Sequence, residues 1–372
     1  MRSIFLFLAI ISSTLLVNCA STSPKKMILP AVTVAPFSVE NKGYTLNGQI
    51  NDVAGSDTIA ILYHGSGVQD RWETMPADVT LDGKPSPTFK IISDQLNSVG
   101  ISTCVFDKRA FKEKNTPAFE KALKTHTFGN IKADAEIIFN YVNNLPQYKK
   151  IVLMGHSEGT ITASDVLFKN KQNSKIKSIV LIGVAAENIK TSIQHQMTDV
   201  MATNTFDAVD KNHDGKIYPD EVPEKLKSSL PINSIDHNKK GYITYEDLLK
   251  VLKKQSVQFM KSVYKAPSDT ILLGKPAQWY KDIFAEKTLL QRANEYSVPV
   301  LIVHGVLDTN VFYSTNALPL SEKLRALHKD VTLISYFDYG HVLSPNKEDG
   351  EPTMGPIQPD AVSAIADWIK LH

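Results

Sequence analysis

Short apolar runs alternate with segments of helical spacing along most of the chain. A run of consecutive apolar residues predicts a strand that is buried on both faces. We expect such strands at 58–63, 101–107, 151–154, 176–184, 298–303 and 331–337. Helical spacing predicts helices at 89–99, 131–145, 160–167, 320–327 and 357–371. This alternation predicts an α/β fold, with a mostly parallel central sheet and helices on both faces.

Two segments depart from this alternation. Residues 31–40 and 44–50 resemble two strands joined by Asn41-Lys42-Gly43, a turn sequence that predicts an N-terminal hairpin. A long interval after the strand at 176–184 contains no further strand of the same kind. We therefore divide the chain into a first core part at 31–186, an insertion at 187–297, and a second core part at 298–372.

The N-terminus is a targeting segment that we exclude from the fold. Met1-Arg2-Ser3 carries positive charge, and residues 4–17 form an apolar run too short to span a membrane comfortably. The run ends in Leu16-Val17-Asn18-Cys19, which resembles the lipobox of bacterial lipoproteins in a looser form. That resemblance implies a signal peptide at 1–19, lipidation of Cys19 and a polar tether at 20–30.

Cys19 decides where the protein is expected to reside. Two or three acyl chains on this residue would hold the protein on a membrane of the bacterial cell envelope, facing the periplasm or the surface. Ordinary cleavage with loss of Cys19 would instead give a secreted protein. The other cysteine, Cys104, lies in an apolar run, so the chain has no disulfide framework and Cys104 is expected to be buried.

Composition excludes one class of partner. The 372 residues include 41 basic and 39 acidic side chains, and a net charge of +2 gives no case for nucleic acid. A composition of 42% hydrophobic and 22% charged residues is that of a globular chain long enough to bury a full core. The sequence does not indicate an oligomeric state.

The stretch from Lys149 to Gly159 carries the first chemical signal. The buried strand at 151–154 runs directly into Gly155-His156-Ser157-Glu158-Gly159, and helical spacing follows. Strand, sharp turn and helix form the context that a Gly-x-Ser-x-Gly nucleophile elbow requires. Glycines flank the serine because a Cβ on either side of this strained turn would clash. We therefore predict Ser157 as a nucleophile.

A serine hydroxyl becomes a good nucleophile when a base accepts its proton and a carboxylate orients that base. Asp308 follows the predicted strand at 298–303, and His341 follows the strand at 331–337. Both therefore lie at strand ends, in the chain order serine, aspartate, histidine. We predict His341 as the general base and then acid, Asp308 as its orienting carboxylate, and Asp338 as the fallback acid.

The developing oxyanion needs two backbone N–H donors. The N–H of Glu158 lies at the start of the predicted helix, whose dipole adds positive potential. The sequence His64-Gly65-Ser66-Gly67 follows another predicted strand, and we predict the Ser66 N–H as the second donor.

A family resemblance follows from these motifs. From about 31 to 372, without the insertion, the chain resembles an α/β-hydrolase of the serine aminopeptidase-like or esterase group. Residues 65–71 and 155–159 carry the resemblance most specifically. Val68 stands where the group often has proline, and residues 107–112 lack the usual Asp-x-Arg-Gly-x-Gly pattern. The resemblance implies acyl transfer to water from an ester, amide or thioester, with no organic cofactor.

The insertion contains a calcium-binding signature. Residues 210–221 match the EF-hand loop at every expected position. Gly215 allows the sharp turn of such a loop. The expected ligands are side-chain oxygens of Asp210, Asn212 and Asp214, the Lys216 carbonyl, Tyr218 through water, and the bidentate carboxylate of Glu221. We therefore predict a structural calcium ion in this loop.

A second loop at 236–247 matches only in part. Asp236 and Asn238 offer oxygens, but Lys240 places a cation at a ligand position and Asp247 is one methylene shorter than glutamate. We interpret this loop as a structural mate of the first, and weak metal binding stays open. In the α/β-hydrolase fold, caps over the active site commonly enter after the strand that follows the elbow helix, and the insertion lies there. We therefore predict a calcium-binding lid. A calcium-stabilised appendage remote from the chemistry is the alternative.

Three functions stay open on the sequence alone. The leading interpretation is a membrane-anchored serine hydrolase that cleaves ester-type bonds of small-molecule or lipid-like acyl substrates through an acyl-enzyme. An aminopeptidase- or amidase-type enzyme is an alternative, since no residue identifies the leaving group. The other alternative is a non-catalytic, calcium-binding surface lipoprotein that uses the hydrolase fold as a scaffold.

Overall fold

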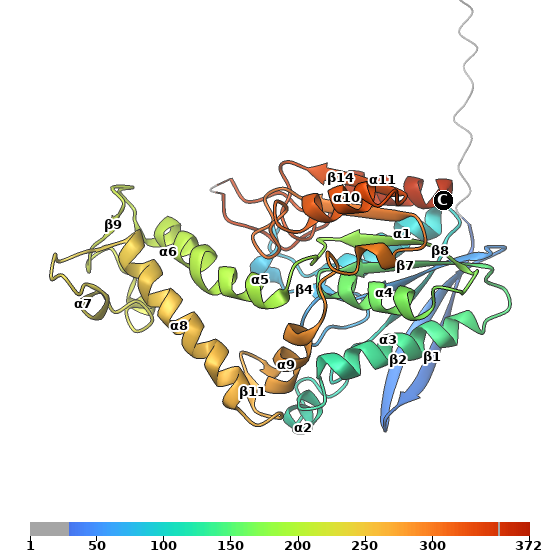
Figure 1. Cartoon of the computed structure of the whole chain (residues 1–372), viewed down its shortest axis with the longest axis horizontal. Helices are drawn as coiled ribbons and strands as arrows, with labels where there is room; N and C mark the ends of the chain where they lie inside the picture. Colours follow the sequence, from blue (N-terminus) through green and yellow to red (C-terminus); the bar gives the residue numbers. More distant parts are fainter. Residues whose placement is uncertain (1–29, 349) are drawn as a thin grey trace, which may run out of the picture.

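A central eight-stranded sheet organises the computed structural model, which describes residues 30–348 and 350–372 (Figure 1). The predicted signal peptide, Cys19 and all but the last residue of the tether lie outside the described residues. The strands of this sheet are β1 (Val32–Asn41), β2 (Tyr44–Val53), β3 (Thr58–Tyr63), β6 (Ser102–Phe106), β7 (Lys150–His156), β8 (Ile176–Ile182), β13 (Val300–Gly305) and β14 (Val331–Tyr336).

The strand order is β1-β2-β6-β3-β7-β8-β13-β14. Only the hairpin side is antiparallel: β2 pairs in this way with β1 and with β6. The six strands from β6 to β14 pair in parallel, as the alternation of strands and helices predicts. The expected α/β-hydrolase architecture, a mostly parallel sheet with helices on both faces, is confirmed.

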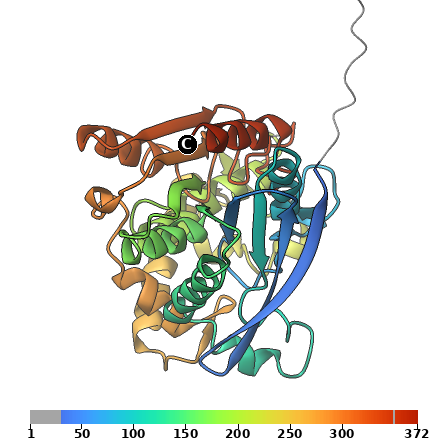
Figure 2. The same ribbon diagram turned by 90° about the vertical axis from the view of Figure 1, so that its right-hand side faces the viewer.

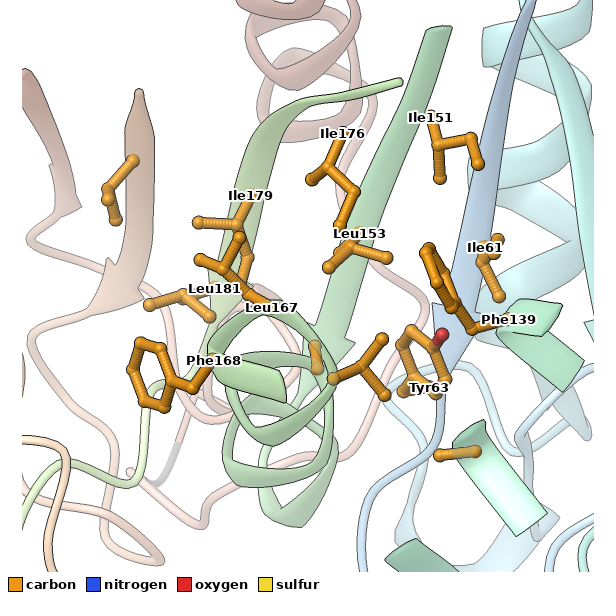
Figure 3. Packing of buried hydrophobic residues seen from close by; sticks show 14 of the residues in the cluster. Ile61, Tyr63, Phe139, Ile151, Leu153, Leu167, Phe168, Ile176, Ile179 and Leu181 are labelled. Atoms are coloured by element: carbon orange, nitrogen blue, oxygen red, sulfur yellow. The ribbon is translucent and has the colours of Figure 1, made fainter. Parts of the chain in front are cut away.

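Helices cover both faces of this sheet (Figures 1 and 2). The helices packed on one face are α1 (Thr88–Ser98) and α11 (Pro359–Leu371), and those on the other are α3 (Phe128–Asn143), α4 (Glu158–Lys169) and α10 (Ala317–Ala326). The two cores explain why residues 151–154 of β7 are all apolar. Ile151 and Leu153 belong to the core under α3 and α4, whereas Val152 and Met154 belong to the core under α1 and α11. Figure 3 shows Leu153 and Leu167 of α4 among the side chains of the first of these cores.

The insertion forms an arm that extends away from the sheet (Figure 1). Its elements are α5 (Ile189–His195), the π-helical turn η2 (Gln196–Val200), α6 (Met201–Val209), β9 (Lys216–Ile217), α7 (Ile232–Ile235), β10 (Ile243–Thr244), α8 (Tyr245–Lys265), β11 (Ile271–Leu272), β12 (Lys275–Pro276) and α9 (Ala277–Ala285). The far end of the arm has its own apolar core, which includes Phe206, Ile217, Ile243 and Leu252. The near end packs on the main body through α9.

Several features were not predicted. Leu289, Ala293 and Tyr296 belong to the main core, although they fall inside the expected insertion at 187–297. Small elements escaped the pattern because they are too short to show a period: β4 (Thr74–Met75), β5 (Ser86–Pro87), α2 (Phe119–Leu123) and the 3-10 turns η1 (Ala77–Val79), η3 (Glu224–Leu226) and η4 (Ala293–Glu295). Within the part of the chain that the structure describes, no helix combines the length and apolar character needed to cross a membrane.

Candidate active site

The nucleophile elbow has the strained backbone expected of it. Ser157 links β7 to α4 with φ +54° and ψ −121°, a conformation that side-chain-bearing residues rarely adopt. A Cβ on Gly155 would lie 2.2 Å from the Gly159 carbonyl oxygen, and a Cβ on Gly159 would lie 2.0 Å from that of Tyr63. Both glycines are therefore required by close backbone contact, and Ser157 lines a cavity of about 340 Å³.

His341 and Asp308 form the contact expected of a base and its orienting carboxylate. His341 Nδ1 lies 2.7 Å from Asp308 Oδ2, and both residues are buried. Asp308 Oδ1 accepts the N–H groups of Asn310 and Val311, each at 2.8 Å, and His304 Nε2 lies 3.1 Å from Oδ2. Burial alone would raise the pKa of Asp308, but the charges and hydrogen bonds of His341 and His304 outweigh it and hold that pKa well below its usual range.

Ser157 and His341 line the same cavity. Among the described residues no hydrogen bond joins the Ser157 hydroxyl to His341, a contact that often tightens only when substrate binds. The structure thus brings His341 and Asp308 into contact and places Ser157 on the wall of the same cavity. The fallback acid Asp338 is exposed, and Asp308 takes the position beside the imidazole.

The loop that contains Ser66 lies against the nucleophile. A Cβ on Gly65 would lie 3.3 Å from Ser157 Cβ. The Gly65 N–H donates to Glu73 Oε1 at 2.7 Å, which leaves Ser66 as the next amide along the loop. The Glu158 N–H belongs to the first residue of α4, where helix geometry provides no intrahelical acceptor. Both residues line the cavity, and their role as oxyanion donors stays a prediction.

The Glu158 side chain makes contacts that the sequence did not indicate. Its buried carboxylate lies 2.8 Å from Lys108 Nζ, and it accepts the Ser66 hydroxyl at 3.1 Å and the Trp279 indole N–H at 3.0 Å. Trp279 lies on α9, so this carboxylate connects the insertion to the elbow and to the loop that contains Ser66. Lys108 also donates to the Gly65 carbonyl at 2.7 Å. Lys108 lies in the segment 107–112, where the chain lacks the glycine-rich pattern of related hydrolases. Its contacts could not be predicted from that segment because its partners are distant in sequence.

A second buried carboxylate, that of Glu73, contacts the histidine of the elbow. Glu73 Oε1 is 3.0 Å from His156 Nδ1, and His156 Nε2 is 3.4 Å from the His341 carbonyl oxygen. Burial alone would raise the pKa of Glu73 and lower that of His156. The attraction between the two outweighs burial, so the pKa of Glu73 is lowered and that of His156 is raised. This pair therefore links the loop that contains Ser66, through Gly65, to the segment that holds His341.

Replacing Glu73 by glutamine should lower the free energy of unfolding by about 3 kcal/mol, the cost of removing one partner from a buried pair. The raised pKa of His156 contributes stability below the unfolded value of about 6.5, and this contribution is lost as pH rises through the folded pKa. Without Glu73, burial lowers the pKa of His156, so acid destabilises the variant. The loss in free energy of unfolding relative to the wild type, measured by urea unfolding, should thus be larger at about pH 5.5 than at about pH 8.5. A deficit that does not vary with pH would contradict the assignment, and Glu322→Gln on the exposed surface is the control.

The first acidic loop is closed by hydrogen bonds from its own backbone. Asp210 accepts the N–H of Asp214 at 3.3 Å and that of Gly215 at 2.9 Å. Gly215 has φ +76°, which explains the glycine at this position. The remaining bonds of this kind, each 2.9 Å long, are from Asp214 N–H to Asn212, from Lys216 N–H to Asp214 and from Tyr218 N–H to Glu221. The acidic side chains thus point back over their own loop.

The same loop pairs with the second loop through two short strands. Ile217 of β9 is opposite Ile243 of β10 in antiparallel register. The oxygen donors of the first loop are of the kind that calcium prefers. Across residues 30–348 and 350–372, no group of three or more His, Cys, Asp or Glu side chains is placed to hold a metal ion. The residues fit calcium by their chemistry, and binding would require the carboxylates to converge.

In the second loop, a lysine side chain forms an ion pair with the last acidic residue. Lys240 Nζ lies 2.7 Å from Asp247 Oδ2, and Asp247 also accepts the N–H and hydroxyl of Thr244 at 3.0 and 2.8 Å. The hydrogen bond from Lys240, with help from Thr244, lowers the pKa of Asp247 to about 2. Asp236 accepts the backbone N–H of Lys240 at 3.0 Å, and Asn238 is exposed. These contacts close the second loop on itself, and its role as a structural mate of the first loop stays a prediction.

The insertion lines the cavity, but its acidic loops do not. Residues from α5 and α9, including Ile193 and Tyr280, share the cavity with Ser157. The lining includes no residue of 210–221 or 236–247, and both loops lie at the far end of the arm (Figure 1). The near end of the insertion therefore forms part of the cavity wall, whereas the loops are remote from Ser157.

A mostly parallel sheet, a serine elbow after strand β7 and a buried His–Asp pair define a serine hydrolase of the α/β-hydrolase class. Residues 85–345 match the family described as serine aminopeptidase, S33, and the protein belongs to this family. It is therefore an enzyme.

The chain is similar to several known proteins. Esterase EstD of Thermotoga maritima is 22% identical over 345 residues, which cover 90% of this chain and 69% of that protein. Est1E of Butyrivibrio proteoclasticus, solved with ferulic acid bound, has a TM-score of 0.52 at 14% identity and covers 90% of this chain and 98% of its own. An esterase of Pyrococcus furiosus has a TM-score of 0.52 at 16% identity and covers 91% of each chain. At these identities the structural likeness shows the fold alone.

Proposed function

We propose that the protein hydrolyses carboxylic esters through an acyl-enzyme on Ser157. The observation that carries this proposal is the 2.7 Å contact between His341 and Asp308 beside the cavity that Ser157 also lines. The relative from Thermotoga maritima is itself named an esterase, which supports an ester over an amide. The intact set of three residues also argues against a purely structural scaffold.

The proposed reaction transfers the acyl group first to Ser157 and then to water. Ser157 Oγ attacks the ester carbonyl carbon while His341 Nε2 accepts its proton, and Asp308 stabilises the resulting imidazolium. The N–H groups of Ser66 and Glu158 hold the oxyanion. The intermediate then expels the alcohol, which takes the proton from His341. Water, activated by the same imidazole, releases the acid and restores Ser157.

Labelling with a fluorophosphonate probe tests this proposal. The folded protein should form one covalent adduct, which peptide mass spectrometry should place on Ser157. Folded protein that stays unlabelled would support the scaffold alternative. A panel of short esters, thioesters and aminoacyl amides then separates the esterase from the aminopeptidase-type enzyme, because the latter should prefer the amides.

We further propose that Cys19 is lipidated and holds the enzyme on a membrane of the cell envelope. The support is the sequence Leu16-Val17-Asn18-Cys19 after an apolar run. The protein produced in bacteria should partition into a detergent phase, and Cys19→Ala should move it to the aqueous phase. Equal partition of both forms would contradict the anchor.

Calcium in the first loop is a separate part of the proposal. Calcium at about 100 times its dissociation constant should raise the free energy of unfolding by about 2.7 kcal/mol over protein with chelator. Glu221→Gln should remove most of this shift because it removes the bidentate carboxylate. Asp220→Asn, one residue earlier and not an expected ligand, should keep it. Since the loop is remote from the cavity, turnover by folded enzyme should not change. A melting temperature that is the same with calcium and with chelator would contradict calcium binding.

A further inference from the structure

One lysine of the cap lies in the cavity without an acidic partner. Lys275 belongs to β12, lines the same cavity as Ser157 and is only partly exposed. A tight turn presents it, since Leu273 and Gly274 between β11 and β12 have φ of +43° and +74°. Its Nζ lies 4.8 Å from the centre of the Trp279 ring. The ammonium is thus held at a defined place above an aromatic face.

The carboxylates nearby are already engaged. Glu158 and Glu73 are the acidic residues that line the cavity. Glu158 is paired with Lys108 at 2.8 Å, and Glu73 with His156 at 3.0 Å. Within the described part of the chain, no carboxylate lies within ion-pair distance of Lys275. Lys275 is therefore a lysine of the cavity wall that forms no ion pair.

Burial disfavours this charge. Loss of solvent lowers the pKa of Lys275, and the attraction of Glu158 offsets only part of that effect. An aromatic ring compensates a cation less than a carboxylate does. A ligand that brought its own anionic group to Lys275 would complete the pairing that the protein leaves open.

We propose that Lys275 selects ester substrates that carry a second, ionised carboxylate. This inference rests on the proposed esterase activity and adds the substrate class. The ammonium would bind the free carboxylate while the ester carbonyl lies at Ser157, so Lys275 is a specificity-determining residue of the cap. It also gives the insertion a direct role in the reaction, because Lys275 and Trp279 both come from it.

Matched pairs of substrates test the proposal. On the acyl side, monomethyl adipate carries a free carboxylate and methyl hexanoate does not. On the alcohol side, 4-acetoxybenzoate carries a free carboxylate and its methyl ester does not. In at least one pair the wild-type enzyme should show a kcat/KM for the anionic member at least about tenfold above that of the neutral one, in keeping with a charge-assisted contact. Lys275→Met should remove this ratio, and Lys275→Arg should retain part of it. Lys265→Met, an exposed lysine of α8, is the matched control and should keep the ratio.

Each outcome decides a distinct point. Neutral esters that react as well as their anionic partners in the wild type, or a preference that survives Lys275→Met, would overturn the inference and leave the esterase intact. Wild-type data alone test the proposal if Lys275→Met does not fold. Absence of both turnover and fluorophosphonate labelling would overturn the esterase instead. In that case, calorimetric titration of the wild type and of Lys275→Met with monomethyl adipate tests the anion site without turnover. Binding that depends on Lys275 supports the site, and equal or absent binding refutes it.

Discussion

Ser157→Ala should lower kcat for ester hydrolysis by on the order of 10⁶-fold while the protein stays folded. Alanine removes the atom that forms the acyl-enzyme, so only the oxyanion donors and substrate binding continue to accelerate attack by water. The elbow should tolerate the change, because alanine keeps the Cβ that Ser157 already accommodates at φ +54°. Initial rates on a 4-nitrophenyl ester measure the effect.

Contamination is the main risk in this measurement. Residual activity should therefore be titrated with a fluorophosphonate, since any labelled fraction reports wild-type enzyme and not the variant. Thermal unfolding of Ser157→Ala within a few degrees of the wild type would confirm that the loss is chemical. Retention of more than about one per cent of kcat would mean that another group is the nucleophile.

Asp308→Asn should lower kcat by about 10⁴-fold. Asp308 Oδ1 accepts two backbone N–H groups, so the amide oxygen of asparagine would take that position. The NH₂ group would then replace Oδ2, which faces His341 Nδ1 at 2.7 Å and His304 Nε2 at 3.1 Å. An NH₂ in that place donates to Nδ1 and fixes the tautomer with hydrogen on Nε2, which cannot accept the serine proton.

Asp338→Asn is the matched control for this prediction. Asp338 lies three residues before His341, and its side chain is exposed. Its substitution by asparagine removes the same charge as Asp308→Asn. It should change kcat by less than about threefold, as expected of a surface substitution. A similar loss in both variants would assign the effect to the charge of the segment, and a loss in Asp338→Asn alone would restore the fallback acid.

The parts of the site that could be predicted are those in which one short stretch fixes both residue and geometry. The elbow is such a case: the run of β7, the two glycines and the helix that follows are contiguous, and steric contact at Gly155 and Gly159 requires them. Asp308 was predictable because parallel strands end at one edge of the sheet, so a polar residue after β13 must lie near the elbow. Glu73 and Lys275 had no such signal, since nothing local reveals which distant group a charged side chain will meet.

The sequence by itself determined the class of the fold, and it predicted the nucleophile with its two partners and two EF-hand-like loops. All of these follow from local periodicity or from motifs whose chemistry depends on neighbouring residues. Only the tertiary structure decided that the near end of the insertion lines the cavity while its acidic loops lie away from it. It also decided that Glu158 contacts Lys108, Ser66 and Trp279, and that Lys275 lines the same cavity as Ser157 without an ion-pair partner. The physical reason is that burial and charge pairing depend on which surfaces meet when the chain folds, and sequence periodicity carries no information on that choice.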